Sequence, residues 1–148
     1  MSSVSELLTK ELCEELTRAG ISSLPLEACG ILVDQGDRGL HSVQLPNRAK
    51  DEGHFEMAAK DVARALEGNA WVGSWHSHPG GDSTPSPADR EAGWQGGLCL
   101  IVGLSSDRKS ALCSLWSLKG GAFELLERQE IHPQEATHAP GQPFASST

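Results

Sequence analysis

The sequence predicts an α/β domain in which helices flank a mixed β-sheet. Three observations support this fold class. The N-terminal region has an apolar period of four residues, several short apolar runs are separated by turn residues, and a helical pattern lies between two of those runs. The chain has 148 residues, which suffices for one domain with a hydrophobic core and is too short for two. We place the domain at residues 1–131.

The first predicted element is an amphipathic helix over residues 3–19. Ser3 and Glu6 have the spacing of a capping box, in which each side chain bonds the other residue's backbone N–H. The apolar residues that repeat along one face of this helix are Val4, Leu8, Leu12 and Leu16. Gly20 follows, and we expect it to end the helix.

A hairpin is predicted next. Residues 28–33 are an apolar run typical of a buried strand, residues 34–39 carry turn chemistry, and residues 40–45 form the return strand. After a polar loop over residues 47–53, the pattern of residues 55–66 predicts a second helix, closed by Gly68 and Asn69.

The second half of the domain is predicted to contain four strands and one short helix. Ser86 has the position of an N-cap, with Pro87 at the first helical position and Asp89 in the first turn. The predicted strands cover residues 70–78, 98–104, 111–118 and 123–131, and the almost uninterrupted apolar run of residues 98–104 is the best candidate for a central strand. Residues 132–148 have little to bury, and we expect a mobile tail.

Composition restricts the class of partner and the compartment. The net charge of −8 leaves no basic stripe for nucleic acid or an anionic membrane, so we expect neither as a partner. The N-terminal residues lack the pattern of a secretory signal, and no apolar run has the length of a membrane span. Four cysteines in apolar contexts, without a Cys-x-x-Cys pair, are expected to be buried free thiols: Cys13, Cys29, Cys99 and Cys113. We therefore expect a cytoplasmic protein.

The functional hypothesis begins with His76 and His78, which are separated by one residue in a predicted strand. Alternate side chains of a strand share a face, so the two imidazoles can converge on one metal ion. Asp89, returning from the following helix, would be the third ligand. Three protein ligands leave a fourth position for water, which is typical of catalytic zinc.

Two further residues complete a hydrolytic site. Zinc lowers the pKa of a bound water and polarises a carbonyl, but a proton acceptor is still needed. Glu27, a lone carboxylate before an apolar strand, is the best candidate, and Ser86 can donate a hydrogen bond to the developing oxyanion.

Each of these residues alone has a simpler explanation. Two histidines in a strand are more often unrelated to metal, Ser86 and Asp89 are explained by helix capping, and Glu27 by a solvated strand end. We favour the metal site because all of these residues occur together at close spacing.

The motif resembles that of the JAMM (MPN-plus) zinc metallopeptidases. His76-x-His78, seven residues, Ser86, two residues and Asp89, with Glu27 upstream, match the family pattern, and Pro79 and Pro85 fit its longer form. The surroundings of Glu27 and the tripeptide Phe55-Glu56-Met57 are similar to small free-standing bacterial members. The resemblance covers roughly residues 5–130.

The resemblance implies a twisted mixed sheet flanked by helices, similar to the cytidine deaminases. It also implies one Zn²⁺ per chain held by His76, His78 and Asp89, with Glu27 as general acid and base and Ser86 stabilising the tetrahedral intermediate. By analogy with small bacterial members, the expected activity is that of a peptidase or isopeptidase that processes the C-terminal tail of a ubiquitin-like sulfur-carrier protein.

Two other functions stay open at this point. One is a non-catalytic MPN-type binding module, which would hold a protein partner without cleaving it. The other is a peptidoglycan- or phage-associated peptidase, which would keep the hydrolysis and change the substrate.

Overall fold

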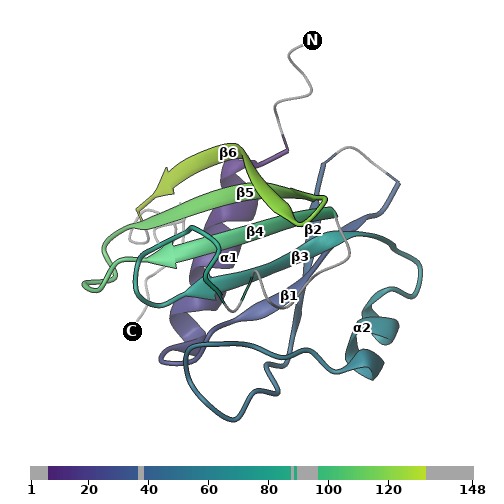
Figure 1. Cartoon of the computed structure of the whole chain (residues 1–148), viewed down its shortest axis with the longest axis horizontal. Helices are drawn as coiled ribbons and strands as arrows, with labels where there is room; N and C mark the ends of the chain where they lie inside the picture. Colours follow the sequence, from purple (N-terminus) through teal and green to yellow (C-terminus); the bar gives the residue numbers. More distant parts are fainter. Residues whose placement is uncertain (1–6, 37–38, 88, 90–96, 133–148) are drawn as a thin grey trace, which may run out of the picture.

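The computed structural model describes residues 7–36, 39–87, 89 and 97–132 (Figure 1). Within these residues, a six-stranded sheet has the order β2-β1-β3-β4-β5-β6. The elements are α1 (Lys10–Ser23), β1 (Cys29–Asp34), β2 (His41–Leu45), α2 (Ala59–Ala65), β3 (Ala70–His78), β4 (Gly97–Leu104), β5 (Ala111–Lys119) and β6 (Ala122–Ile131). The predicted α/β class is confirmed.

The sheet is mixed because β3 and β4 are parallel, whereas all its other neighbouring strands are antiparallel. Two parallel neighbours cannot be joined by a tight hairpin, so the chain must return along the sheet between them. Ser86 and Asp89 belong to this connection, which follows the C-terminal end of β3 directly. The parallel pair therefore brings the second half of the motif back towards the strand that carries the first half.

The two helices lie against opposite faces of the sheet (Figure 1). Helix α1 buries Leu12 and Leu16 in the main core, together with Leu32 of β1 and Leu100 of β4. Alternate residues of β1 point to the other face, where a smaller cluster includes partly buried residues of α2. Trp75 is fully buried in the main core, as strand alternation predicts for a residue next to His76.

Helix α1 differs from the prediction at both ends. It begins at Lys10, because Thr9 is the N-cap and its hydroxyl accepts a hydrogen bond from the Leu12 N–H at 3.1 Å. The expected capping box of Ser3 and Glu6 lies outside the described residues. Gly20 does not end the helix, which continues to Ser23. A β-carbon at Gly20 would lie 3.1 Å from the Ser77 β-carbon, so this glycine permits close packing of α1 on β3.

The second helix is shorter than predicted. It begins at Ala59 rather than residue 55, and it ends at Ala65. Its start leaves Phe55 in the loop before the helix, where the ring contacts the metal-ligand candidate His76. In the expected third helix, Pro87 and Asp89 are helical, and the residues that follow lie outside the described part of the chain.

The remaining predictions concern the strands, the cysteines and the tail. All six strands match their predicted bounds to within one residue at each end. The four cysteines are buried and free, as expected. Of the predicted tail, only residue 132 is described, so its mobility and the domain boundary stay predictions.

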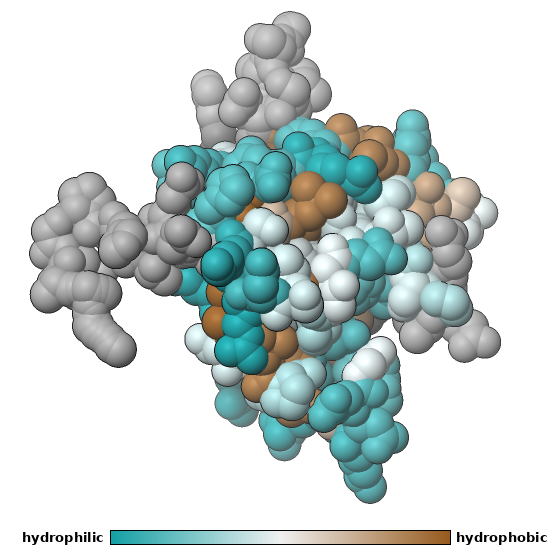
Figure 2. All heavy atoms as spheres, turned by 90° about the vertical axis from the view of Figure 1, so that its left-hand side faces the viewer, coloured by the Kyte–Doolittle hydropathy of each residue, from teal (hydrophilic) through white to brown (hydrophobic). Residues whose placement is uncertain are grey.

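The surface that Figure 2 presents is largely hydrophilic, with apolar residues in separate groups. Large apolar side chains that are exposed include Leu26, Trp71, Leu125 and Leu126. Within the described residues, no helix has the length and hydrophobicity required to cross a membrane.

Candidate metal centre

The end of β3 presents His76 and His78 on one face of the sheet, opposite the face that packs on α1. Their Nε2 atoms lie 3.1 Å apart. His76 is 1% exposed, and His78 is partly exposed at the strand end. The predicted convergence of the two imidazoles is confirmed.

Asp89 completes the cluster from the other side. Its Oδ2 atom lies 3.1 Å from His76 Nε2 and 3.2 Å from His78 Nε2. The same oxygen accepts a hydrogen bond from the Ser86 N–H at 2.8 Å, and the Asp89 N–H donates to Ser86 Oγ at 3.1 Å. This reciprocal pair has the form of a capping box, with aspartate in the position usually held by glutamate. The two hydrogen bonds that cap the helix therefore also orient the Asp89 carboxylate.

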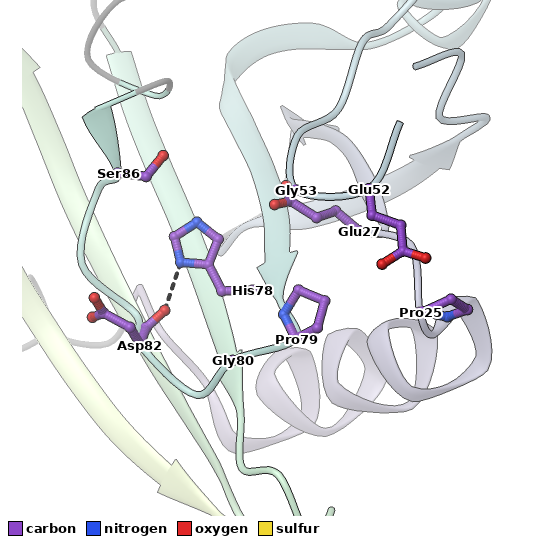
Figure 3. A pocket seen from close by; sticks show the side chains of 9 residues that line it. All are labelled: Pro25, Glu27, Glu52, Gly53, His78, Pro79, Gly80, Asp82 and Ser86. Atoms are coloured by element: carbon purple, nitrogen blue, oxygen red, sulfur yellow. Dashed lines mark hydrogen bonds between the residues drawn. The ribbon is translucent and has the colours of Figure 1, made fainter. Parts of the chain in front are cut away.

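The His78 ring is oriented by the loop that follows it. Its Nδ1–H donates to the backbone carbonyl of Asp82 at 2.5 Å, which leaves the Nε2 lone pair available for a metal (Figure 3). Asp82 itself is held by the Thr84 N–H, which donates to Asp82 Oδ1 at 2.9 Å. This bond lowers the pKa of Asp82, with a contribution from the positive charge of Arg128.

The His76 ring is oriented by packing. Phe55 stacks on it, with ring centroids 4.5 Å apart and an angle of 27° between the rings. Burial lowers the pKa of His76 and favours the neutral imidazole, which is the form that binds metals. Its buried Nδ1 atom has no hydrogen-bond partner among the described residues.

The donor set fits a zinc ion. Tetrahedral ligands at about 2.0–2.1 Å from zinc lie about 3.3 Å from one another. The three candidate atoms are 3.1–3.2 Å apart, and two imidazole nitrogens with one carboxylate oxygen are typical zinc ligands. Burial opposes ionisation of Asp89, but its short contacts with the ring nitrogens of His76 and His78 outweigh burial and lower the pKa of Asp89. The carboxylate is therefore charged, as a metal ligand must be.

Glu27 lies beside this cluster because of the register between β1 and β3. Cys29 pairs with His76, and Ala28 and Ser77 form two hydrogen bonds: Ala28 N–H to Ser77 Oγ at 2.8 Å and Ser77 N–H to the Ala28 carbonyl at 2.9 Å. Continuing this antiparallel register brings Glu27 level with His78. The register therefore places Glu27 beside the strand end that carries His78.

A cleft of about 450 Å³ opens above these residues. Figure 3 shows Glu27 and Ser86 on either side of the His78 ring. The cleft is lined by Pro25, Glu27, Glu52, Gly53, His78, Pro79, Gly80, Asp82 and Ser86. Glu27 is only 6% exposed, and burial raises its pKa to about 7. A carboxyl with a pKa near neutrality can both accept and donate a proton.

Asn47 connects Glu27 to the loop that contributes Glu52 and Gly53 to the lining of the cleft. Its Nδ2 atom donates to the carbonyls of Glu27 and His54, at 2.9 and 3.3 Å. Its Oδ1 atom accepts from the N–H groups of Ala49 and Glu56, at 2.9 and 3.1 Å. The sequence does not predict this role of Asn47, because a single asparagine in a polar loop is equally typical of a turn. Phe55 was missed as a packing partner of the site because it was assigned to the second helix.

The structure thus brings together all five residues predicted for the site. The mixed sheet and the cluster of two histidines and one carboxylate define a JAMM/MPN-type domain. The family described as prokaryotic homologs of the JAB domain matches residues 9–119, and the chain belongs to this family.

Individual proteins agree with this placement. The chain is 34% identical over 86 residues to the desampylase of Haloferax volcanii, an alignment that covers 52% of this chain and 62% of the desampylase. A solution structure of a Desulfitobacterium hafniense protein is similar with a TM-score of 0.70 and 27% identity, over 80% of this chain and 88% of that one. A JAB1/MPN domain protein from Archaeoglobus fulgidus shares the fold, with a TM-score of 0.52 and 19% identity over 79% of this chain and 91% of that one.

Proposed function

We propose that this protein is a zinc-dependent isopeptidase of the JAMM type. One observation carries the proposal: Glu27, with a pKa of about 7, lines the same cleft as His78, and His78 belongs to a cluster with the geometry of a zinc site. A module that only binds a partner has no need for a proton acceptor beside an open coordination position.

In the proposed centre, His76 and His78 would hold zinc through Nε2 and Asp89 would hold it through Oδ2. Zinc there would supply Lewis acidity, which polarises the substrate carbonyl and lowers the pKa of the attacking water. The Asp82 carbonyl and the Ser86 N–H keep His78 and Asp89 in their binding orientations.

The proposed hydrolysis needs two further groups. Glu27 accepts a proton from water as the water oxygen bonds to the carbonyl carbon, and then donates it to the amide nitrogen as the C–N bond breaks. The oxygen of Ser86 already accepts the Asp89 N–H, so its hydroxyl hydrogen is free to point into the cleft and stabilise the developing oxyanion. The products are a carboxylate and an amine.

The proposed substrate is the C-terminal tail of a ubiquitin-like protein of the sulfur-carrier type, joined through an isopeptide bond. The similarity to a desampylase supports a protein substrate of the ubiquitin-like class. The sulfur-carrier identity rests on the resemblance to small bacterial members of the family.

The test compares three substrates by mass spectrometry with zinc-loaded protein. They are a ubiquitin-like carrier protein linked through its C-terminal Gly-Gly to a lysine side chain, the same carrier fused to a peptide, and a muropeptide mixture. We expect cleavage after the Gly-Gly tail, loss of cleavage with a chelator, and recovery when zinc is restored. Cleavage of muropeptides alone would move the protein to the peptidoglycan class, and binding without cleavage of any substrate would make it a binding module.

A further inference from the structure

A polar network that is buried at Ser83 and Ser114 lies next to the metal cluster, and the proposed mechanism does not use it. It consists of Ser83 in the loop after β3, Ser114 and Trp116 on β5, and Arg128 on β6. We call these four residues the Ser114 network. Ser83 is 2% exposed and Ser114 is fully buried, so the polar groups of both depend on partners within the protein.

Ser83 is held by both its side chain and its backbone. The hydroxyls of Ser83 and Ser114 are 2.7 Å apart, and the Trp116 Nε1–H donates to the Ser83 carbonyl at 3.0 Å. Ser114 and Trp116 are two residues apart on β5 and therefore face the same side of the sheet. The loop is thus fixed at two points against β5, which is paired on both sides within the sheet.

Arg128 completes the network from β6. It is the direct cross-strand partner of Ser114, and its Nε–H donates to Ser114 Oγ at 2.9 Å. The Ser114 hydroxyl therefore has two partners, Arg128 on one side and Ser83 on the other. The network extends from the edge strand β6 to the loop that follows the metal-ligand strand.

The position of Ser83 determines the position of the Asp82 carbonyl, since the two residues share one planar peptide group. That carbonyl accepts the His78 Nδ1–H. Gly103 of β4 allows this approach, because a β-carbon there would overlap the backbone of Gly81 and Asp82. The loop lies against the sheet through a contact that only glycine permits.

We propose that the Ser114 network positions His78 for metal binding by holding the Asp82 carbonyl against His78 Nδ1. Ser83, Ser114, Trp116 and Arg128 are then positioning residues that act through Asp82. The inference rests on the metal centre of the proposed function, and it requires no particular substrate. It differs from a purely structural role of the network, which would affect the stability of the β5–β6 edge and leave the His78 ring unchanged.

The experiment uses two variants of the full chain, which remove different contacts of the network. Ser114→Ala removes the hydroxyl between Ser83 and Arg128, and Trp116→Phe removes the indole N–H while keeping a ring. Ser117→Ala on the same strand and Trp71→Phe at the start of β3 are the matched controls. Folding is checked by circular dichroism and thermal unfolding.

Two readouts follow. The first is the His78 tautomer in the metal-free protein at pH 9, by long-range ¹⁵N NMR, where we expect the Nδ1–H form in the parent and a mixture in each variant. The second is the zinc dissociation constant from chelator competition. Loss of a direct hydrogen-bond partner of a ligand typically weakens metal binding about 10–100-fold, so for this indirect contact we expect about 3–10-fold, with controls unchanged.

The outcomes separate the possibilities. Folded variants with the parent tautomer and parent zinc affinity would overturn the inference. If one variant fails to fold, the other still tests the same carbonyl through its own contact. A parent protein that binds no zinc, with a tautomer that changes in the variants, would refute the metal centre while leaving the positioning of His78 intact.

Discussion

Ser86 and Asp89 hold each other through two hydrogen bonds, Ser86 N–H to Asp89 Oδ2 and Asp89 N–H to Ser86 Oγ. The carboxylate oxygen in this pair is also the one that lies 3.1 Å from His76 Nε2 and 3.2 Å from His78 Nε2. The local motif that begins a helix therefore also orients the Asp89 carboxylate as a metal-ligand candidate. It also positions the Ser86 hydroxyl at the cleft.

The first prediction concerns the charge of this ligand. Asp89→Asn keeps an oxygen that can accept a hydrogen bond from the Ser86 N–H, but it removes the negative charge that would offset the positive charge of the zinc ion. We expect zinc affinity to fall by at least about 100-fold, measured by chelator competition and elemental analysis. Asp107→Asn, in a surface turn, is the control and should bind zinc as the parent does. Parent-like zinc affinity in Asp89→Asn would contradict the assignment of this ligand.

The second prediction separates proton transfer from metal binding. Glu27→Gln keeps the size of the side chain and removes its ability to accept a proton. We expect kcat for carrier-protein cleavage to fall by about 10²–10⁴-fold, with one zinc per chain retained. Glu67→Gln, on an exposed turn after α2, provides the control. Full cleavage by zinc-loaded Glu27→Gln would remove Glu27 from the mechanism.

The third prediction is a pH dependence of stability in the metal-free protein. Burial raises the pKa of Glu27 from 4.5 to about 7, so the folded state holds this proton more tightly than the unfolded chain does. The resulting stabilisation is complete below pH 4.5 and is lost as the pH rises through about 7. Glu27→Gln has no such proton to lose, so its free energy of unfolding should not fall in this way. Between pH 4.5 and pH 8, the free energy of unfolding of the variant minus that of the parent should therefore rise by up to about 3 kcal/mol.

Urea unfolding of both proteins without metal, at several pH values, measures this difference. An equal change of unfolding free energy with pH in Glu27→Gln and the parent would show that Glu27 has an ordinary pKa. The measurement does not depend on the substrate or on catalysis.

The fourth prediction concerns the hydrogen bonds of the Asn47 side chain. Asn47→Ala removes four hydrogen bonds, which link Glu27 to the loop that contains Ala49, His54 and Glu56. We expect a loss of about 1–3 kcal/mol in the free energy of unfolding. Because Asn47 bonds the Glu27 carbonyl and no metal-ligand candidate, we also expect a lower kcat and unchanged zinc affinity. A change in zinc affinity with normal kcat would contradict this role.

The fifth prediction tests the crossing of the loop over β4. Gly103→Ala places a β-carbon against the backbone of Gly81 and Asp82, which must move. We expect a destabilisation of about 1–3 kcal/mol together with weaker zinc binding. Gly80→Ala, where a β-carbon meets open space, should change stability by less than about 0.5 kcal/mol. Equal stabilities of the two variants would contradict the close contact.

The strands were predictable because their signals are local. The run over residues 98–104 is apolar almost without interruption, and it forms the buried strand β4 to within one residue. Helix ends were harder, since they depend on contacts that a sequence pattern does not contain. Gly20 was expected to end α1, but its missing side chain is used to pack the helix against Ser77 and Leu104. The hydrogen bond from the Leu12 N–H to Thr9 Oγ1 marks the start of that helix, whereas the sequence pattern had placed its start at residue 3.

The sequence by itself determined the α/β class, the strand positions and the identity of the five candidate site residues. Both the period of a strand and the spacing of a ligand motif depend on residues that are close together in the sequence. Only the tertiary structure decided how those residues are supported. Phe55 on His76, Asn47 beneath Glu27 and Ser83 against Ser114 join segments that are distant in sequence. Such contacts follow from the order and register of the strands, and no local pattern of residues specifies them.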